Sequence, residues 1–156
     1  VARARQLADR HNVAEFRAFV ADAARDDLGG PYDVVISSLF LHHLDESSAV
    51  ALLRRLPGLC RLEAWMDDLS RSRLGYWLAI GGCRVVTRSP VVRFDGPASV
   101  RSAWTPDEAL RLAQRAGLKA AWIERRWRER YVLGWSRPGA EAEAAWRATP
   151  KSGTPS

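Results

Sequence analysis

The chain has 156 residues, 47% of them apolar, which is enough length and hydrophobicity for one globular domain with a core. No apolar run is long enough to cross a membrane, so we expect no membrane partner. No charged-then-apolar leader points to secretion, so we expect a cytoplasmic location. Lys and Arg number 24 against 18 Asp and Glu, and the net charge of +6 is compatible with an anionic partner.

Three short elements are expected before residue 32. Residues 1–12 read as a helix whose arginines are solvated. Phe16–Asp22 alternates apolar residues with others, which predicts a short strand. Asp26–Pro31 contains the first glycine pair and is expected to be a loop.

The segment Tyr32–Leu44 is the most informative part of the sequence. The run Val34–Ile36 has no polar alternation, which is typical of a strand buried on both faces in a parallel sheet. Ligands of such sheets bind beyond the carboxyl ends of the strands. Residues 37–43 therefore lie where a ligand is expected.

A βαβ unit is predicted from this strand onward. Asp45 begins a capping sequence, and leucines at helical spacing follow until Pro57-Gly58, which are expected to disturb or end the helix. Leu62–Met66 is the candidate second strand, and Asp67-Asp68 follow it. A crossover of this kind is right-handed.

The second half of the chain predicts two helices and two strands. Leu69–Ile80 is expected to be a helix that ends at Gly81-Gly82, and Val85–Ala103 an irregular lid, because Pro90 and Gly96-Pro97 interrupt it. Thr105 opens a second helix as its cap, with Glu108 completing a capping box, and Gly117 ends it. The expected strands are 120–127 and 130–135, and residues 138–156 are expected to form a disordered tail.

Several of these motifs, in this order, resemble class I S-adenosylmethionine-dependent methyltransferases. The sequence Asp33-Val-Val-x-Ser-Ser-Leu-x-Leu-His-His-Leu44 resembles their fourth strand and the following loop. Asp68–Tyr76 resembles the loop and helix after their fifth strand. Ser102–Leu110, continuing to Ala116-Gly117-Leu118, resembles the helix before their last two strands. The resemblance covers residues 1–137, in which 69–103 would be the substrate lid.

The resemblance implies an α/β fold with part of a Rossmann-like sheet, namely strands 3, 4, 5, 6 and 7 of a family order 3-2-1-4-5-7-6. The family's glycine-rich turn, which follows its first strand, has no counterpart in this sequence. We therefore expect an amino-terminal piece to be missing, of about 50 residues or more if it held a βαβ unit and its lead-in. Phe16–Val20 would be loosely held or would pair directly with the next strand, and these residues alone are not expected to close a cofactor pocket.

The resemblance also implies cofactor contacts. Asp22 and Ala23 correspond to the residues at which the family holds the adenine, and Ser37, Ser38 and Leu39 to those near the methionine part of S-adenosylmethionine. The alternatives are an Asp22 that only caps a turn and serines that only bond to nearby carbonyl groups.

His42 and His43 are the candidate catalytic residues. Adjacent residues on an extended backbone point in opposite directions, so the pair is a poor chelator and no metal is expected. One imidazole could act as a base on the methyl acceptor while the other is structural, or both could be merely polar. Cys60 and Cys83 lack metal-binding spacing and are expected to be reduced thiols.

The expected substrate contacts are Asp68, Arg71 and Tyr76, which would orient a small-molecule methyl acceptor. The alternative for Asp68 is an ion pair with Arg71 or Arg73. The alternative for Tyr76 is packing in the core.

Two other functions stay open. The dense arginines of 125–130, with aromatic residues between them, could bind nucleic acid or another anion, although a solvated face is the more ordinary interpretation. The chain could also be an inactive truncated product.

Overall fold

The computed structural model describes residues 1–127 and 129–139, so most of the predicted tail and Arg128 lie outside the described residues. The described elements, in chain order, are α1 (Ala2–Arg10), β1 (Tyr32–Ser38), the short 3₁₀ helix η1 (Leu41–His43), α2 (Glu46–Leu59), β2 (Cys60–Leu69), α3 (Arg73–Val86), α4 (Pro90–Ser102), α5 (Pro106–Arg115), β3 (Ala121–Arg126) and β4 (Arg130–Ser136).

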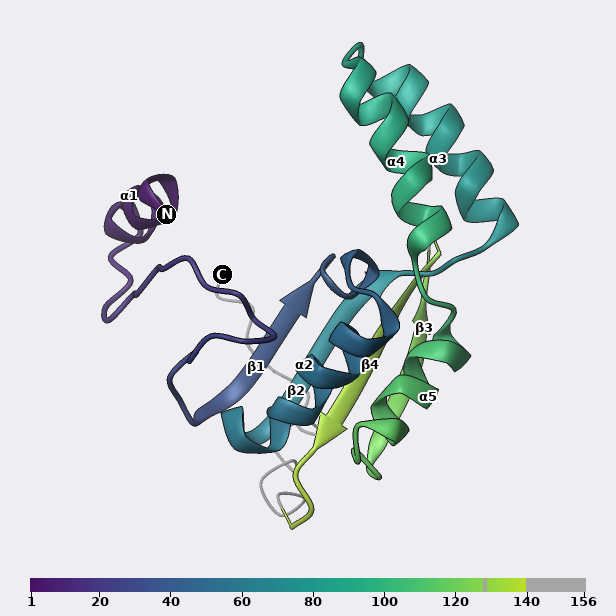
Figure 1. Ribbon diagram of the computed structural model, residues 1–156. Coiled ribbons are helices and arrows are strands. Elements are labelled where there is room, and N and C mark those ends of the chain that lie inside the picture. The colour runs from purple at the N-terminus through teal and green to yellow at the C-terminus, as the bar shows by residue number, and fades with distance from the viewer. Residues whose placement is uncertain (128, 140–156) are drawn as a thin grey trace, which may run out of the picture.

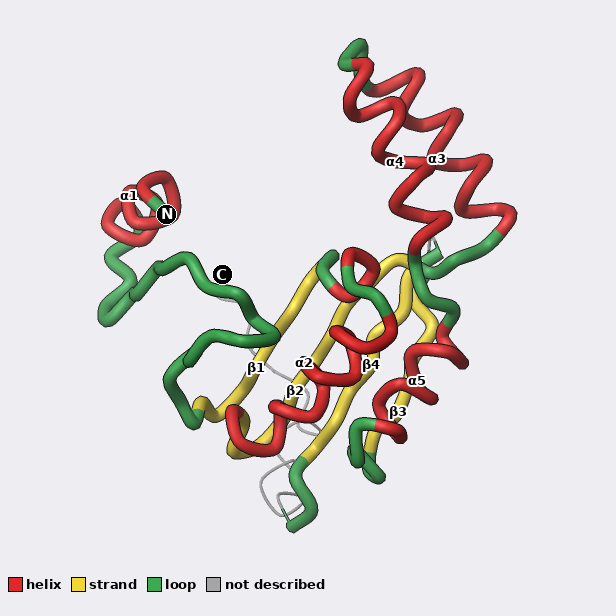
Figure 2. The backbone as a smooth tube through the Cα atoms, viewed as in Figure 1, coloured by secondary structure: helices red, strands yellow, loops and turns green. Residues whose placement is uncertain are grey.

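The four described strands form one mixed sheet in the order β1-β2-β4-β3. β1 and β2 are parallel and are joined by α2, so the predicted βαβ unit is present, while β4 runs antiparallel to both of its neighbours. Helices α2 and α5 cover one face of the sheet (Figure 1). The helices α3 and α4 form a hairpin that projects beyond the edge where β1 and β2 end (Figure 2).

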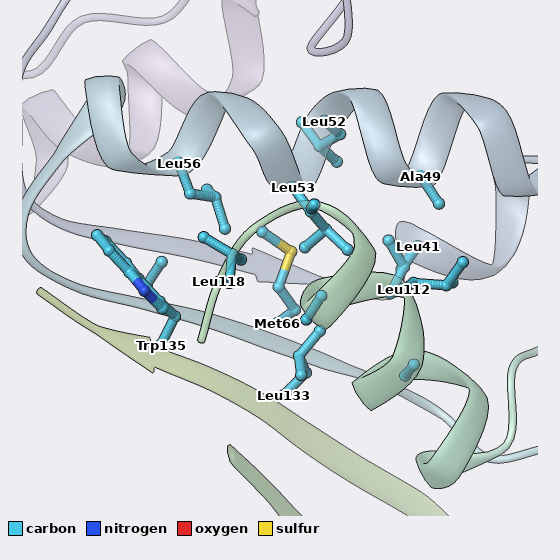
Figure 3. Packing of buried hydrophobic residues seen from close by; sticks show 14 of the residues in the cluster. Leu41, Ala49, Leu52, Leu53, Leu56, Met66, Leu112, Leu118, Leu133 and Trp135 are labelled. Carbon is cyan, nitrogen blue, oxygen red and sulfur yellow. The ribbon is translucent and has the colours of Figure 1, made fainter. Parts of the chain in front are cut away.

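The core lies between this sheet and the two covering helices. Leu53 and Leu56 of α2 and Leu112 of α5 are buried against Met66 of β2 and Leu133 of β4 (Figure 3). Each side chain of this size contributes about 1.5–3 kcal/mol when it is removed from water. This packing fixes the positions of the strand ends, where the candidate site lies.

On the opposite face of the sheet, the indole of Trp122 lies over Gly134. A Cβ atom at Gly134 would come within 2.2 Å of Cζ2 of Trp122. The two residues are direct partners in the β3–β4 ladder. The glycine is therefore required by close contact with the aromatic ring, not by its backbone conformation.

We expect Gly134→Ala to lower the free energy of unfolding by about 1–3 kcal/mol, because the added methyl group displaces the indole. Urea unfolding followed by circular dichroism measures the change. The control is the same substitution in a Trp122→Ala background, where the methyl group has space. An equal loss in both backgrounds would show that the contact with Trp122 is not the cause.

The capping box predicted at the start of α5 is present. The Thr105 hydroxyl accepts from the Glu108 amide, and the Glu108 carboxylate accepts from the Thr105 amide. Burial alone would raise the pKa of Glu108, but the hydrogen bonds from Thr105 and the charge of Arg71 outweigh it and lower the pKa. Ionised Glu108 therefore stabilises the folded state.

We expect Glu108→Gln to lower the free energy of unfolding by about 0.5–1 kcal/mol at pH 7. Because the pKa of Glu108 is lowered on folding, its contribution is present above the ordinary value of 4.5 and is lost as the pH falls through the folded-state pKa. Unfolding curves of both proteins from pH 7 to pH 2 test this. A difference that stayed constant over that range would contradict it.

The predicted strand at Phe16–Asp22 is wrong. Residues 16–22 have no strand structure, and the only element before Tyr32 is α1. The side chain of Arg5 donates to Ala18 O at 3.1 Å, while Phe19 and Val20 are exposed. A segment with an alternating pattern forms a strand only when a neighbouring strand offers hydrogen-bond partners. Residues 16–22 do not pair with β1, the nearest strand along the chain. The sheet thus contains four of the five expected strands.

Both predicted boundaries of α3 were also wrong. α3 begins at Arg73, after a β2 that extends to Leu69, and continues through Gly81-Gly82 to Val86. α2 continues through Pro57 and Gly58 to Leu59, because its leucines remain packed on the sheet. Packing on the sheet and on α4 outweighs the helix-breaking tendency of Pro57-Gly58 in α2 and of Gly81-Gly82 in α3.

The predicted irregular lid at 85–103 is instead mostly the helix α4. Pro90 lies in the first turn, where proline is compatible with a helix, and α4 packs on α3. Gly96 allows this close approach, since a Cβ there would lie 2.5 Å from Cys83 Sγ. The hairpin nevertheless lies at the strand ends, where a lid was expected.

Candidate functional site

The centre of the candidate site is the turn η1, which follows β1. The predicted extended backbone at the histidines is wrong, because Leu41–His43 form a single 3₁₀ turn. The two imidazole rings consequently lie together, with their centroids 4.0 Å apart. His42 is buried, at 5% exposed, whereas His43 is exposed. The two histidines therefore have different environments.

A buried pair joins His42 to Asp68 at the end of β2. Nδ1 of His42 lies 2.6 Å from Oδ1 of Asp68, and the backbone amide of His42 donates to Oδ2 at 3.1 Å. The Leu69 amide also donates to Oδ1, at 2.7 Å. Asp68 is only 1% exposed, so this carboxylate is satisfied entirely from within the protein.

This arrangement determines the role of each ring nitrogen. An ionised carboxylate can only accept, so Nδ1 carries the proton and donates to Asp68. Nε2 of His42 is then the nitrogen left to accept a proton from a ligand. A carboxylate holding an imidazole in this tautomer is the usual means of orienting a histidine base.

The ion pair considered for Asp68 with Arg71 or Arg73 does not form. Arg71 instead pairs with Glu108, at 2.5 Å, and its backbone amide donates to Trp104 O. Asp68 is buried on its side of β2, where it meets His42. The preceding residue, Asp67, faces the opposite side of β2 and accepts a forked contact from Arg130, with distances of 3.0 and 2.6 Å.

A cleft of about 400 Å³, here called the histidine cleft, opens beside this pair. It lies between the strand ends and the base of the α3–α4 hairpin. Its polar lining comes from His42, His43, Asp95, Ser99 and Arg130, and its apolar lining from Leu39, Leu69, Ala79 and Val100, with Gly96 completing it. A mainly apolar hollow with a few converging polar groups is the usual form of a small-molecule site.

A second hollow of about 550 Å³, the Tyr76 cleft, adjoins the first, since Val100 lines both. Arg71 and Tyr76, two of the predicted substrate residues, line this second cleft together with Trp77 and Arg101. The Arg101 guanidinium lies 5.8 Å from the centroid of the Tyr76 ring. Tyr76 is therefore at a cleft, not in the core. The third predicted substrate residue, Asp68, lines neither cleft and contacts His42 in the interior.

The predicted cofactor residues at the end of β1 are next to the histidine cleft. Ser37 is partly buried and Ser38 is exposed, and Leu39 lines the cleft. Leu39 has a φ of +53°, which is unusual for a residue other than glycine, and its amide donates to Asp67 O at 2.9 Å. Such conformations are concentrated at ligand sites.

Asp22 and Ala23 are held in a local turn. The Asp22 carboxylate accepts from the Ala24 amide at 2.9 Å and lies 3.8 Å from the Arg25 guanidinium, as the alternative of a capping role anticipated. Arg55 of α2 donates to Ala23 O at 2.7 Å, which fixes this turn against the helix.

Tyr131 is a further buried polar residue beside the pair. It lies directly opposite Asp68 in the β2–β4 ladder and is fully buried, and its hydroxyl has no hydrogen-bond partner within the described part of the chain. Burial, with the negative charges of Asp68 and Glu108 nearby, raises the pKa of Tyr131 well above its usual range. Its hydroxyl therefore stays protonated and neutral.

The described arginines of the β3–β4 hairpin have acidic neighbours. Arg125 lies 3.6 Å from Asp107, and Arg126 lies 2.9 Å from Glu124. With Arg130 joined to Asp67, this hairpin offers less free positive charge to a nucleic acid than its sequence indicated. Within residues 1–127 and 129–139, no three His, Cys, Asp or Glu side chains gather in a way that could hold a metal ion.

The fold has counterparts among solved structures. No family model matches the chain, and no curated protein matches its sequence. A structure described as a putative O-methyltransferase from Nostoc punctiforme superposes with a TM-score of 0.62 and 18% identity, covering 86% of this chain and 40% of that one. The chain has the fold of part of a methyltransferase.

Two more structures with this methyltransferase fold were matched, both with bound S-adenosylhomocysteine (SAH). PigF superposes with a TM-score of 0.61 and 15% identity, over 87% of this chain and 40% of its own. Magnesium protoporphyrin IX methyltransferase from Synechocystis superposes with a TM-score of 0.55 and 19% identity, over 88% of this chain and 59% of its own. The chain thus spans about 40–60% of the length of these methyltransferases.

Sequence reasoning missed three polar residues of the histidine cleft: Asp95, Ser99 and Arg130. Asp95 carried a signal, because it is the first acidic residue after Asp68 in a stretch rich in arginine and valine. Ser99 and Arg130 carried none. Their positions depend on where α4 folds back and on the pairing of β2 with β4.

Proposed function

We propose that this chain is the carboxyl-terminal portion of an S-adenosylmethionine-dependent methyltransferase that acts on a small-molecule acceptor. The observation that carries the proposal is the buried His42–Asp68 pair beside a cleft at the carboxyl ends of β1 and β2. A methyltransferase fold supplies the context. The strand order supports it too, because β1-β2-β4-β3 agrees with 4-5-7-6, the second half of the family order.

His42 is the proposed general base. Its Nε2 would accept the proton of an acceptor hydroxyl or amine as the acceptor attacks, while Asp68 holds the ring and stabilises the positive charge that forms on it. His43, which is exposed and lacks a carboxylate partner among the described residues, would assist in binding. Asp68 contributes by positioning His42, since it is too deeply buried to contact the acceptor.

The end of β1 fits the methionine part of the cofactor. The left-handed conformation of Leu39 turns the chain sharply after Ser37 and Ser38, which leaves the tip of the strand open beside the cleft. Asp22 fits the adenine less well, because its carboxylate is used in its own turn. Asp22 and Ala23 would contact the adenine only in a longer protein, in which strands that precede this chain hold the segment in place.

Bound S-adenosylmethionine supplies a methyl group on a sulfonium centre, whose departure leaves a neutral thioether. The protein therefore needs mainly to align the acceptor and to exclude water. The apolar residues Leu39, Leu69 and Val100 would exclude water, and Asp95 and Ser99 would orient polar groups of the acceptor. Arg71 and Tyr76, in the adjoining cleft, would hold its distal part.

Calorimetric titration with SAH tests the proposal. The 156 residues alone should bind weakly or not at all, because the family's glycine-rich turn is not among them. The same residues preceded by the segment encoded upstream should bind, at micromolar concentrations or tighter. If upstream sequence encodes no strand followed by a glycine-rich turn, or if the longer protein does not bind SAH, the proposed function is wrong.

A further inference from the structure

The tip of the α3–α4 hairpin exposes an unusual number of apolar side chains. In the last turn of α3, Val85 is 88% and Val86 is 85% exposed. In the first turns of α4, Val91 is 74% and Phe94 is 80% exposed. All four lie close to the connection between the helices, at the end of the hairpin farthest from the sheet (Figure 1). A contiguous exposed apolar patch marks a surface that contacts something other than water.

The same tip is positively charged. Arg84, Arg88 and Arg93 are exposed there, and residues 81–94 contain no Asp or Glu. Arg93 also donates from Nε to Thr87 O at 2.8 Å and from Nη2 to Arg84 O at 3.2 Å, which closes the connection between the two helices. Arg84 and Arg88 have no acidic partner within the described residues. The tip therefore combines apolar side chains with charges that are not neutralised.

This combination matches the interface of an anionic bilayer. Apolar side chains enter the boundary between headgroups and acyl chains, while arginines contact the lipid phosphates. A protein partner fits less well, because the tip offers only the connected ends of two helices and a stable protein interface needs a broad complementary area. No helix in the described ranges is long and apolar enough to cross a bilayer.

We propose that the hairpin tip, residues 84–94, docks on the surface of an anionic membrane. The sequence predicted no membrane partner because it has no spanning run, and docking on a membrane surface requires no such run. The base of the same hairpin, with Tyr76 and Ala79 of α3 and Ser99 of α4, lines the two clefts. Docking would therefore turn the cleft edge of the sheet toward the lipid (Figure 2).

Co-sedimentation with vesicles tests the proposal. The 156-residue protein should bind vesicles of equal parts phosphatidylglycerol and phosphatidylcholine at low salt, and binding should be lost in 1 M salt. Pure phosphatidylcholine vesicles should bind far less. Arg84→Gln with Arg88→Gln should weaken binding about twenty-five-fold, since each arginine near an anionic surface contributes about five-fold. Val85→Ser with Phe94→Ser should weaken it at least ten-fold.

The matched control is Arg125→Gln with Arg126→Gln, which removes the same charge from the other hairpin and should change binding less than three-fold. Circular dichroism verifies that each variant is folded. Absence of binding to anionic vesicles, or an equal loss in both arginine pairs, would overturn the proposal. A third result would also overturn it. If sedimentation velocity shows that the chain self-associates, and Val85→Ser abolishes the self-association but leaves vesicle binding unchanged, the tip is an interface between copies of this chain.

Discussion

Replacing Asp68 with alanine is expected to lower the free energy of unfolding by about 3–5 kcal/mol. The substitution removes the acceptor of three hydrogen bonds, those from His42 Nδ1, the His42 amide and the Leu69 amide. Water cannot readily replace it, because Asp68 and His42 are both buried. Leaving buried donors without partners is one of the few single changes that destabilise a protein this strongly.

The neighbouring residue supplies the control for this experiment. Asp67 also forms an ion pair, with Arg130, but both side chains are partly exposed. Asp67→Ala should therefore lower stability by about 1 kcal/mol or less. Urea denaturation of the two variants and the unsubstituted chain gives both values. If Asp68→Ala is no more harmful than Asp67→Ala, the buried pair does not hold the turn at His42.

The second large effect concerns catalysis by the longer methyltransferase in which we place this chain. His42→Gln should reduce the rate of methyl transfer by about 10²–10⁴-fold, because glutamine cannot accept the acceptor's proton. His43→Gln should reduce it less than ten-fold, since His43 is exposed and no carboxylate within the described residues orients its ring.

Initial rates with S-adenosylmethionine separate catalysis from binding. The apparent affinity for the cofactor should be similar in both histidine variants, because neither side chain is expected to hold it. A rate loss at His43 that equals or exceeds the loss at His42 would reverse the assignment. If weaker cofactor binding accounts for the whole loss of rate in both variants, neither histidine is the base.

The elements that sequence analysis predicted well are those whose signals are local. The capping box of Thr105 and Glu108 and the stop at Gly117 both correspond to structure, and the run at Val34–Ile36 does form a strand, β1. Each depends on residues within a few positions of one another. The prediction that this strand is buried on both faces was wrong, because β1 is the edge strand of the sheet and Val34 and Ile36 are 45% and 69% exposed. The strand predicted at Phe16–Asp22 failed because a strand depends on a neighbour that only the rest of a sheet can supply.

Only part of the candidate site was predicted, because its contacts, like those of a strand, join residues that are distant in the sequence. The histidines and Asp68 were each singled out, but their contact joins residues 26 positions apart and depends on the register of β1 against β2. Parallel strands end at the same edge of a sheet, so the polar residues at the ends of β1 and β2 are expected to lie near one another. This was a signal that His42 and Asp68 could meet. The 3₁₀ turn, which brings His42 rather than His43 to Asp68, had no comparable signal.

The position of the cofactor relative to His42 decides whether this cleft is the site of methyl transfer. A crystal structure of the longer protein with SAH measures this directly. We expect the thioether sulfur beside Ser38 and Leu39, facing the same cleft as Nε2 of His42, with Asp68 still bonded to Nδ1. SAH bound on another edge of the sheet, or an Nε2 directed away from its sulfur, would contradict the proposal that this cleft is where the methyl group is transferred.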